Sequence, residues 1–251
     1  MPSLKRALAE GRRLVGSWVF SASPTVAEAM ACQGLDFVIV DMEHSVTELA
    51  DVLHILRAVG TSGTEVIVRA PDTDVTRLRR LLDAGARNVM FPFVETVAEA
   101  QALASASRYP PDGTRGFAMM HRGAGFGTRP DYIRTASDDI CLIAQIETRA
   151  GLDAMEAIGA VDGIDALFFG PGDLSAVAGM IGQVKAPEVR ALKEHGAEVC
   201  RRLGIASGTL VPDVDSADWA AGAGFDFISV SSDLTMVARG AQSVMGALPR
   251  G

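Results

Sequence analysis

Short apolar runs alternate along the chain with longer segments whose apolar residues recur every three or four positions. The runs are rich in Val, Ile, Leu and Phe and carry no charge in their interiors, which is typical of parallel β-strands covered on both faces. Eight strands are predicted: Leu14–Phe20, Phe37–Asp41, Glu65–Arg69, Asn88–Phe93, Cys141–Ile146, Ala166–Gly170, Ile205–Leu210 and Phe227–Val230.

The segments between these runs are typical of amphipathic helices. The segment 24–34 opens with Pro24 and closes with Gly34, the usual asymmetry between the start and the end of a helix. Apolar side chains also share one face of the segments 47–60, 73–85 and 95–107.

About eight strand–helix units in 251 residues predict an α/β fold, the (β/α)8 TIM barrel, as one domain over residues 1–251. A doubly wound open sheet is the alternative, but no G-x-G-x-x-G follows the first strand to support a dinucleotide-binding version. The Gly- and Pro-rich segment 108–131 is too long for a simple connection, and we expect it over or beside the active site.

The composition of the chain argues against several kinds of binding partner. The net charge of −8 argues against binding to nucleic acid or to an anionic membrane, since both need a basic surface. Residues 1–18 lack a long apolar stretch, so we expect no signal peptide, and no apolar run is long enough to predict a membrane span. Three widely spaced cysteines predict neither a disulfide framework nor a structural zinc site, and we expect a cytoplasmic protein.

Polar side chains collect where the predicted strands end. In a barrel these carboxyl-terminal ends meet at one rim, which is where substrates bind. The second to eighth strands contribute, in order, Asp41, Glu43 and His44; Arg69; Pro92; Gln145 and Glu147; Asp173; Gly208 and Thr209; and Ser229, Ser231 and Ser232.

Two of these carboxylates predict a metal site. Glu147 and Asp173 follow consecutive strands, and two carboxylates with few other ligands suit a hard divalent ion such as Mg²⁺ or Mn²⁺. Gln145 lies two residues before Glu147 and so points to the same side of its strand. The structural alternative is that both acids merely stabilise the first turns of helices, which Asp173 in GPGDLS fits well.

The remaining rim residues predict acid–base chemistry. His44 beside Asp41 has the spacing of an imidazole base oriented by a carboxylate, and Arg69 can stabilise a carboxylate or an enolate oxygen. The alternative for Arg69, a salt bridge to Asp41 or Glu43, is compatible with this role. The residues alone leave open whether Glu43 and His121 take part.

Six segments carry a resemblance to a known family: VIVDMEHS, VRAP, LLDAGARNVMFPFVETVAEA, RYPPDGTRG, AQIETRAGL and DALFFGPGDLS. Together they resemble the HpcH/HpaI family of metal-dependent (class II) pyruvate aldolases. The similarity extends from about Leu14 to about Arg239. It implies a TIM barrel whose last helix is exchanged between subunits of a homo-oligomer, usually a hexamer built as a trimer of dimers.

The resemblance also implies roles for single residues. Glu147 and Asp173 would bind Mg²⁺, Mn²⁺ or Co²⁺, and His44, paired with Asp41, would be a base acting through a water. Arg69 would bind the enolate and carbonyl oxygens. Further substrate contacts would come from Gln145, from the backbone of Gly172 and Asp173, from Leu210 facing the aldehyde, and from Asp83, which would reach a neighbouring subunit's site.

The activity that this implies is the reversible cleavage of a 4-hydroxy-2-oxo acid into pyruvate and an aldehyde. No Schiff-base lysine is expected, because none of Lys5, Lys185 and Lys193 ends a predicted strand. A citryl-CoA or malyl-CoA lyase, a phosphoenolpyruvate-using enzyme and a non-catalytic barrel that binds a small acid are the alternatives. The segments 117–130 and 176–189 depart from the family pattern, so the sequence does not name the aldehyde.

Overall fold

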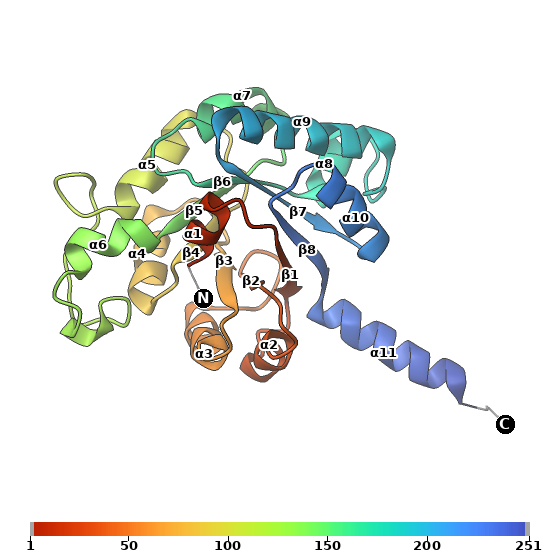
Figure 1. Cartoon of the computed structure of the whole chain (residues 1–251), viewed down its shortest axis with the longest axis horizontal. Coiled ribbons are helices and arrows are strands. Elements are labelled where there is room, and N and C mark those ends of the chain that lie inside the picture. Colours follow the sequence, from red (N-terminus) through yellow and green to blue (C-terminus); the bar gives the residue numbers. More distant parts are fainter. Residues whose placement is uncertain (1–2, 249–251) are drawn as a thin grey trace.

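The structure is a computed structural model that describes residues 3–248. Its centre is a closed barrel of eight parallel strands in the order of the chain (Figure 1), which confirms the predicted (β/α)8 architecture. The strands are β1 (Leu14–Val19), β2 (Phe37–Asp41), β3 (Glu65–Arg69), β4 (Asn88–Phe91), β5 (Cys141–Gln145), β6 (Ala166–Phe169), β7 (Ala206–Val211) and β8 (Phe227–Ser232).

Helices surround the barrel. Pro24 begins α2, where the side chain of Ser23 accepts the N–H of Val26 and caps the helix. The helices are α1 (Leu4–Ala9), α2 (Pro24–Ala31), α3 (Leu49–Val59), α4 (Val75–Ala84), α5 (Val97–Ser107), α6 (Tyr132–Asp139), α7 (Arg149–Gly159), α8 (Pro171–Val177), α9 (Pro187–Leu203), α10 (Val214–Gly222) and α11 (Asp233–Ala247).

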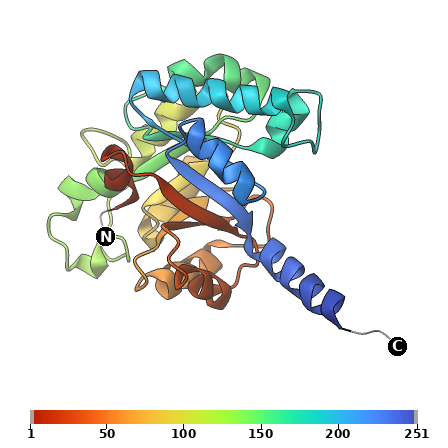
Figure 2. The same ribbon diagram turned by 45° about the vertical axis from the view of Figure 1, so that its right-hand side comes forward.

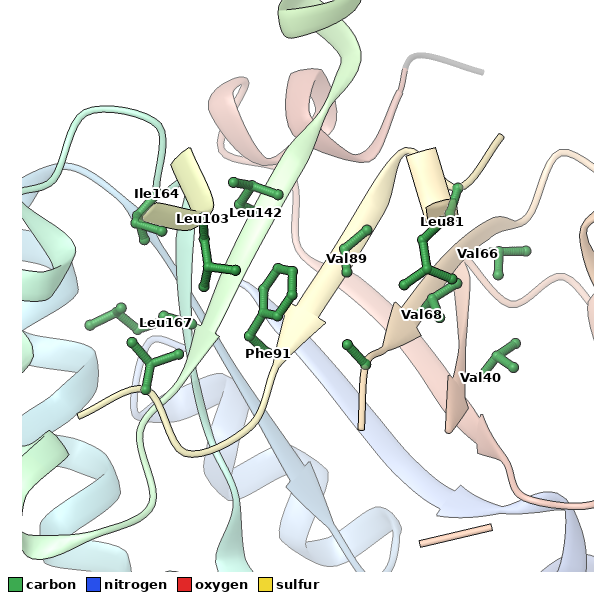
Figure 3. Close-up of a cluster of buried hydrophobic side chains, with 14 of the residues drawn as sticks. Val40, Val66, Val68, Leu81, Val89, Phe91, Leu103, Leu142, Ile164 and Leu167 are labelled. Atoms are coloured by element: carbon green, nitrogen blue, oxygen red, sulfur yellow. The ribbon is translucent and has the colours of Figure 1, made fainter. Parts of the chain in front are cut away.

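Both faces of the strands are apolar because each face packs against its own layer. Alternate residues such as Phe37, Ile39 and Phe168 point inward and fill the barrel. The residues between them point outward to the helices, and Figure 3 shows this layer with Val40, Val68 and Phe91 from strands beside Leu81 of α4 and Leu103 of α5. This double burial explains the continuous apolar runs of the sequence.

The segment 108–131 does not lie over the rim of this chain, so the expected position was wrong here. The N–H of Gly123 donates to the carbonyl of Asp83 at 3.1 Å, and Arg122 donates to the carbonyls of Ala84 and Leu56, each at 3.4 Å. These carbonyls close the last turns of α4 and α3, which run back toward the amino ends of the strands. The segment therefore follows the outer wall, where it satisfies helix ends that would otherwise lack donors.

The last helix, α11, leads away from the barrel (Figures 1 and 2). Of its fifteen residues only Asp233 is buried, while Leu234, Val237 and Val244 are each more than half exposed. An apolar helix surface of this kind is typical of a subunit interface. Exchange of α11 between subunits stays a prediction. No helix within residues 3–248 is long and apolar enough to cross a membrane.

A glycine sets the distance between α9 and β6, the strand that leads to Asp173. A Cβ atom at Gly196 would lie 2.2 Å from the ring of Phe169, which is fully buried, whereas one at Gly222 of α10 would meet nothing within 4 Å. We expect Gly196→Ala to lower the free energy of unfolding by about 1–3 kcal/mol through overpacking, despite the better helix propensity of alanine.

Gly222→Ala is the matched control, since it makes the same change in a helix without the clash. It should leave the free energy of unfolding unchanged or raise it by up to about 1 kcal/mol. Urea denaturation of both variants checks the prediction. Equal stability of the two variants would show that α9 can move away from Phe169 at no cost.

Candidate active site

Asp41 organises the turn that follows β2. Its side chain is fully buried, and its two oxygens accept the backbone N–H groups of Glu43 and His44, each at 3.1 Å. The same carboxylate accepts the Nε–H of Arg69 at 2.7 Å. Asp41 therefore holds both the turn and the guanidinium, which places Glu43 beside Arg69 at the rim.

The expected contact between Asp41 and the His44 imidazole is not formed in this structure. The oxygens of Asp41 are taken by backbone N–H groups and Arg69, so none is directed at the ring. The His44 side chain is 60% exposed, and its Nε2 lies 3.8 Å from Oε2 of Glu43. Glu43 is thus the carboxylate nearest to the imidazole, and the role of His44 as a base stays a prediction.

Arg69 is held on three sides at the mouth of the barrel. Besides the ion pair to Asp41, its Nη1 lies 2.8 Å from Oε2 of Glu43. Its guanidinium stacks 4.5 Å from the ring centre of Trp18, whose Nε1 donates to the Ser229 hydroxyl at 2.8 Å. These contacts leave the buried guanidinium a single orientation, which is what recognition of an anionic oxygen needs.

Glu147 is a buried carboxylate beside Gln145. Its side chain is 2% exposed, Oε1 accepts the N–H of Phe93 at 3.1 Å, and Oε2 accepts the amide Nε2 of Gln145. The pKa of Glu147 is raised to about 7, mainly by burial and also by the nearby carboxylates of Asp173 and Glu43, while the N–H of Phe93 and the Arg69 guanidinium act to lower it. The carbonyl Oε1 of Gln145 is buried and has no hydrogen-bond partner among residues 3–248.

Asp173 lies in the first turn of α8 and is half-buried, as the structural alternative also predicted. It is close enough to act on the pKa values of both Glu147 and Glu43. Burial raises the pKa of Glu43, while Arg69 and His44 lower it. Gly170 makes this gathering possible, because a Cβ atom there would come within 2.6 Å of Oε2 of Glu147 and 2.8 Å of Nε2 of Gln145.

The rim suits a hard divalent cation. Asp41, Glu43, Glu147 and Asp173 face a single guanidinium, so an added positive charge would relieve repulsion among them. Residues 3–248 contain no group of three or more His, Cys, Asp or Glu side chains arranged to hold a metal ion. Two carboxylates, an unpartnered amide oxygen and open positions nevertheless form the all-oxygen set that Mg²⁺ uses with water and substrate.

The other predicted residues lie at different distances from this cluster. Leu210 ends the inward row of β7 and packs on the inner core, and Gly172 is exposed in the first turn of α8. Asp83 lies in the last turn of α4, on the outer wall, where it pairs with Arg115 at 2.8 Å and approaches His121 at 3.5 Å. Neither Asp83 nor His121 joins the rim of its own chain.

Two residues at the rim, Trp18 and Phe93, were not predicted as site residues from the sequence. Trp18 points inward from β1 and supports Arg69; its position on the inward row of a buried strand was an available signal. Phe93 has a positive φ of 51°, which is unusual for a residue with a side chain, and it is 41% exposed. That backbone geometry, which directs its N–H to Glu147, cannot be predicted from the residue type.

Lys193 is also buried, but away from the rim. Its Nζ donates to the carbonyl of Leu210 at 3.2 Å and lies 4.9 Å from the ring of Trp219 in α10, which places it in the outer layer. Burial, aided by Arg190, lowers the pKa of Lys193 to about 7.

The raised pKa of Glu147 makes the stability of the metal-free protein depend on pH. Folding raises this pKa from the 4.5 of an ordinary glutamate to about 7, so the stability that the protonated carboxyl contributes is lost as pH rises through this range. Glu147→Gln should therefore raise the free energy of unfolding at pH 8 by up to about 3 kcal/mol, and the gain should shrink toward pH 5.

Urea denaturation in EDTA between pH 5 and pH 8 measures this difference. Glu28→Gln on the exposed face of α2 is the control, and it should follow the wild-type pH dependence. An unchanged pH dependence in Glu147→Gln would show that Glu147 ionises normally and is not crowded by the other carboxylates.

Comparison with known proteins agrees with this geometry. Residues 14–240 match the family described as HpcH/HpaI aldolase/citrate lyase. A crystal structure of an HpcH/HpaI aldolase/citrate lyase family protein from Burkholderia cenocepacia superposes with a TM-score of 0.93 at 36% identity, covering 97% of each chain.

Two curated relatives are similar over nearly their whole length. A 2-dehydro-3,6-dideoxy-6-sulfogluconate aldolase from Pseudomonas putida is 42% identical over 93% of this chain and 92% of its own. A hydroxypyruvate/pyruvate aldolase from Sagittula stellata is 41% identical with the same coverage. Both carry aldolase names, which favours this activity over a CoA-thioester lyase. The chain belongs to the HpcH/HpaI aldolase/citrate lyase family and is an aldolase.

Proposed function

We propose that this aldolase depends on a divalent metal ion and cleaves 4-hydroxy-2-oxo acids into pyruvate, or a related 2-oxo acid, and an aldehyde. The observation that carries the proposal is the buried Glu147 beside Asp173, with the unpartnered carbonyl of Gln145 and the fixed guanidinium of Arg69 next to it. The hydroxypyruvate/pyruvate aldolase name of one relative supports the class of 2-oxo acid.

The metal would be held by Glu147 and Asp173. Mg²⁺, Mn²⁺ and Co²⁺ all accept carboxylate ligands and leave positions for water and for a 2-oxo acid. When bound, such an ion supplies a Lewis acid for the 2-oxo group. The chain itself supplies Gln145 beside the bound acid, and the backbone N–H groups of Gly172 and Asp173, in the first turn of α8, for its carboxylate.

The chain's residues then move one proton and stabilise one charge. His44, through a water, takes the proton of the C4 hydroxyl, the C3–C4 bond breaks, and its electrons form the enolate of pyruvate. Arg69 faces the negative oxygen as it develops, and Asp41, Glu43 and Trp18 keep the guanidinium in place. The aldehyde leaves, and protonation of the enolate at C3 gives pyruvate.

Two apolar side chains lie where the aldehyde portion of the substrate would bind. Leu210 presents an apolar side chain, and Phe93 is an exposed aromatic ring at the same rim. Both can contact the part of the substrate beyond C4, so they favour an aldehyde with an apolar portion near the carbon that reacts. The two relatives carry different substrate names, so the family name alone does not fix the aldehyde.

We further propose a homo-oligomer, a hexamer arranged as a trimer of dimers. The support is α11, whose apolar side chains Leu234, Val237 and Val244 lack cover in a single chain. In such an assembly Asp83, on the outer wall, would line a neighbouring subunit's site. The free cysteines Cys32, Cys141 and Cys200 fit a reducing cytoplasm as the place of action.

Removal of either metal-binding carboxylate should abolish the metal-dependent reaction. We expect Glu147→Ala and Asp173→Ala to lower kcat/KM for cleavage of a 4-hydroxy-2-oxo acid by about 1000-fold at saturating Mg²⁺, because the Lewis acid is lost. Asp153→Ala, which removes an exposed carboxylate of α7, should keep full activity. Wild-type Mg²⁺ titration curves in the Glu147 and Asp173 variants would refute the ligand assignment.

His44 should act in turnover and not in binding. His44→Ala should lower kcat by about 100-fold or more while the affinity for pyruvate, measured by calorimetry with Mg²⁺ present, stays within about twofold. His54→Ala, which removes an exposed histidine of α3, is the control. Normal turnover in His44→Ala would exclude the imidazole from the proton transfer.

A further inference from the structure

A cavity lies at the opposite end of the barrel from the rim. It has a volume of about 520 Å³ and is lined by the first residues of β3 and β4, Glu65 and Asn88, and by the ends of α3 and α4 at Gly60 and Gly85. The segment 122–140, which includes α6 beside α4 (Figure 1), closes its outer side. The volume is in the range of small-molecule pockets.

Three guanidinium groups line this cavity, and only one has a carboxylate partner. Arg87 pairs with Glu65 at 2.9 Å. Arg122 reaches only the carbonyls of Leu56 and Ala84, at the long distance of 3.4 Å, and Arg129 donates to the carbonyl of Gly123 at 3.2 Å. In the part of the chain that the structure describes, neither Arg122 nor Arg129 forms a salt bridge.

The charges around Arg122 are unfavourable in the absence of an anion. Burial lowers the pKa of Arg122, and the neighbouring Arg57 and Arg87 lower it further. The two carboxylates of the lining are Glu65, which Arg87 and Asn88 already engage, and Asp139. Three arginines against these two acids give a formal charge of +1 in the cavity of a chain whose net charge is −8.

We propose that this cavity binds a small oxyanion with at least two negative charges, either a phosphate group or a polycarboxylate. Guanidinium groups with free N–H donors recognise both kinds of oxygen in a bidentate manner. Such an anion would bridge Arg122 and Arg129 of the segment 122–140 to Arg87 at the start of β4. It would thereby fasten this segment to the barrel and remove the repulsion at Arg122.

Binding is measured with inorganic phosphate and with citrate, each titrated against metal-free protein at constant ionic strength, by calorimetry and by melting temperature. The wild type should bind one or both anions in a saturable manner and melt at a higher temperature. Arg122→Gln, which keeps donors for the helix carbonyls, should weaken binding by about tenfold or more. Binding at the rim is common to all variants, so this difference reports on the cavity.

Further variants distinguish the effect of charge in the cavity from an effect on the folding of the protein. Arg202→Gln makes the same change on the exposed face of α9 and should bind as the wild type does. Asp139→Asn should bind more tightly, since it removes a repelling carboxylate. Arg129→Gln replaces Arg122→Gln if the latter does not fold, and the same loss is expected.

The outcomes identify the ligand or overturn the site. Binding of phosphate alone indicates a phosphate or a phosphate ester, binding of citrate alone indicates a polycarboxylate, and binding of both indicates recognition by charge. Equal affinity in the wild type and in the Arg122 or Arg129 variant would overturn the proposal. The absence of saturable binding by either anion would do the same.

Discussion

The active site depends on the crowding of carboxylates around one guanidinium. Closure of the barrel brings the ends of β2, β3, β5 and β6 to one rim, and three of these strands deliver acids there. Arg69 compensates two of them through direct ion pairs, to Asp41 and to Glu43. Glu147 is left buried beside Asp173 and Glu43, and its pKa is raised to about 7.

Neighbouring residues keep the crowded carboxylates and the guanidinium in place. Gly170 leaves room for Glu147 and Gln145, the N–H of Phe93 is directed at the Glu147 carboxylate, and Trp18 covers the face of Arg69. None of these contacts involves a large loop. The candidate site is therefore built on the ends of strands, which hold its side chains in place.

Much of the fold could be predicted from the sequence, because the strands are buried on both faces and the helices carry one apolar face. The rim acids could be found for the same reason, since each lies at or within four residues of the end of an apolar strand. The contacts that these acids make could not be predicted from the sequence. Asp41 was expected to orient His44, but its oxygens are used by backbone N–H groups and Arg69, a choice that only the geometry of the turn decides.

The segment 108–131 shows a second limit. Its Gly and Pro residues predict a loop, but its location depends on helix carbonyls of α3 and α4 that lie far away in the sequence. The same tertiary contacts bring Arg122 and Arg129 together with Arg87 around one cavity. No local pattern around these three arginines distinguishes them from solvated surface residues.

The proposed reaction requires that the rim residues and a divalent ion together generate a pyruvate enolate. Proton NMR of pyruvate in D₂O with the purified protein tests it most directly, first after metal removal with EDTA and then with added Mg²⁺. We expect the methyl signal to disappear by deuterium exchange only when Mg²⁺ is present. A methyl signal that persists with Mg²⁺, Mn²⁺ and Co²⁺ alike would contradict it.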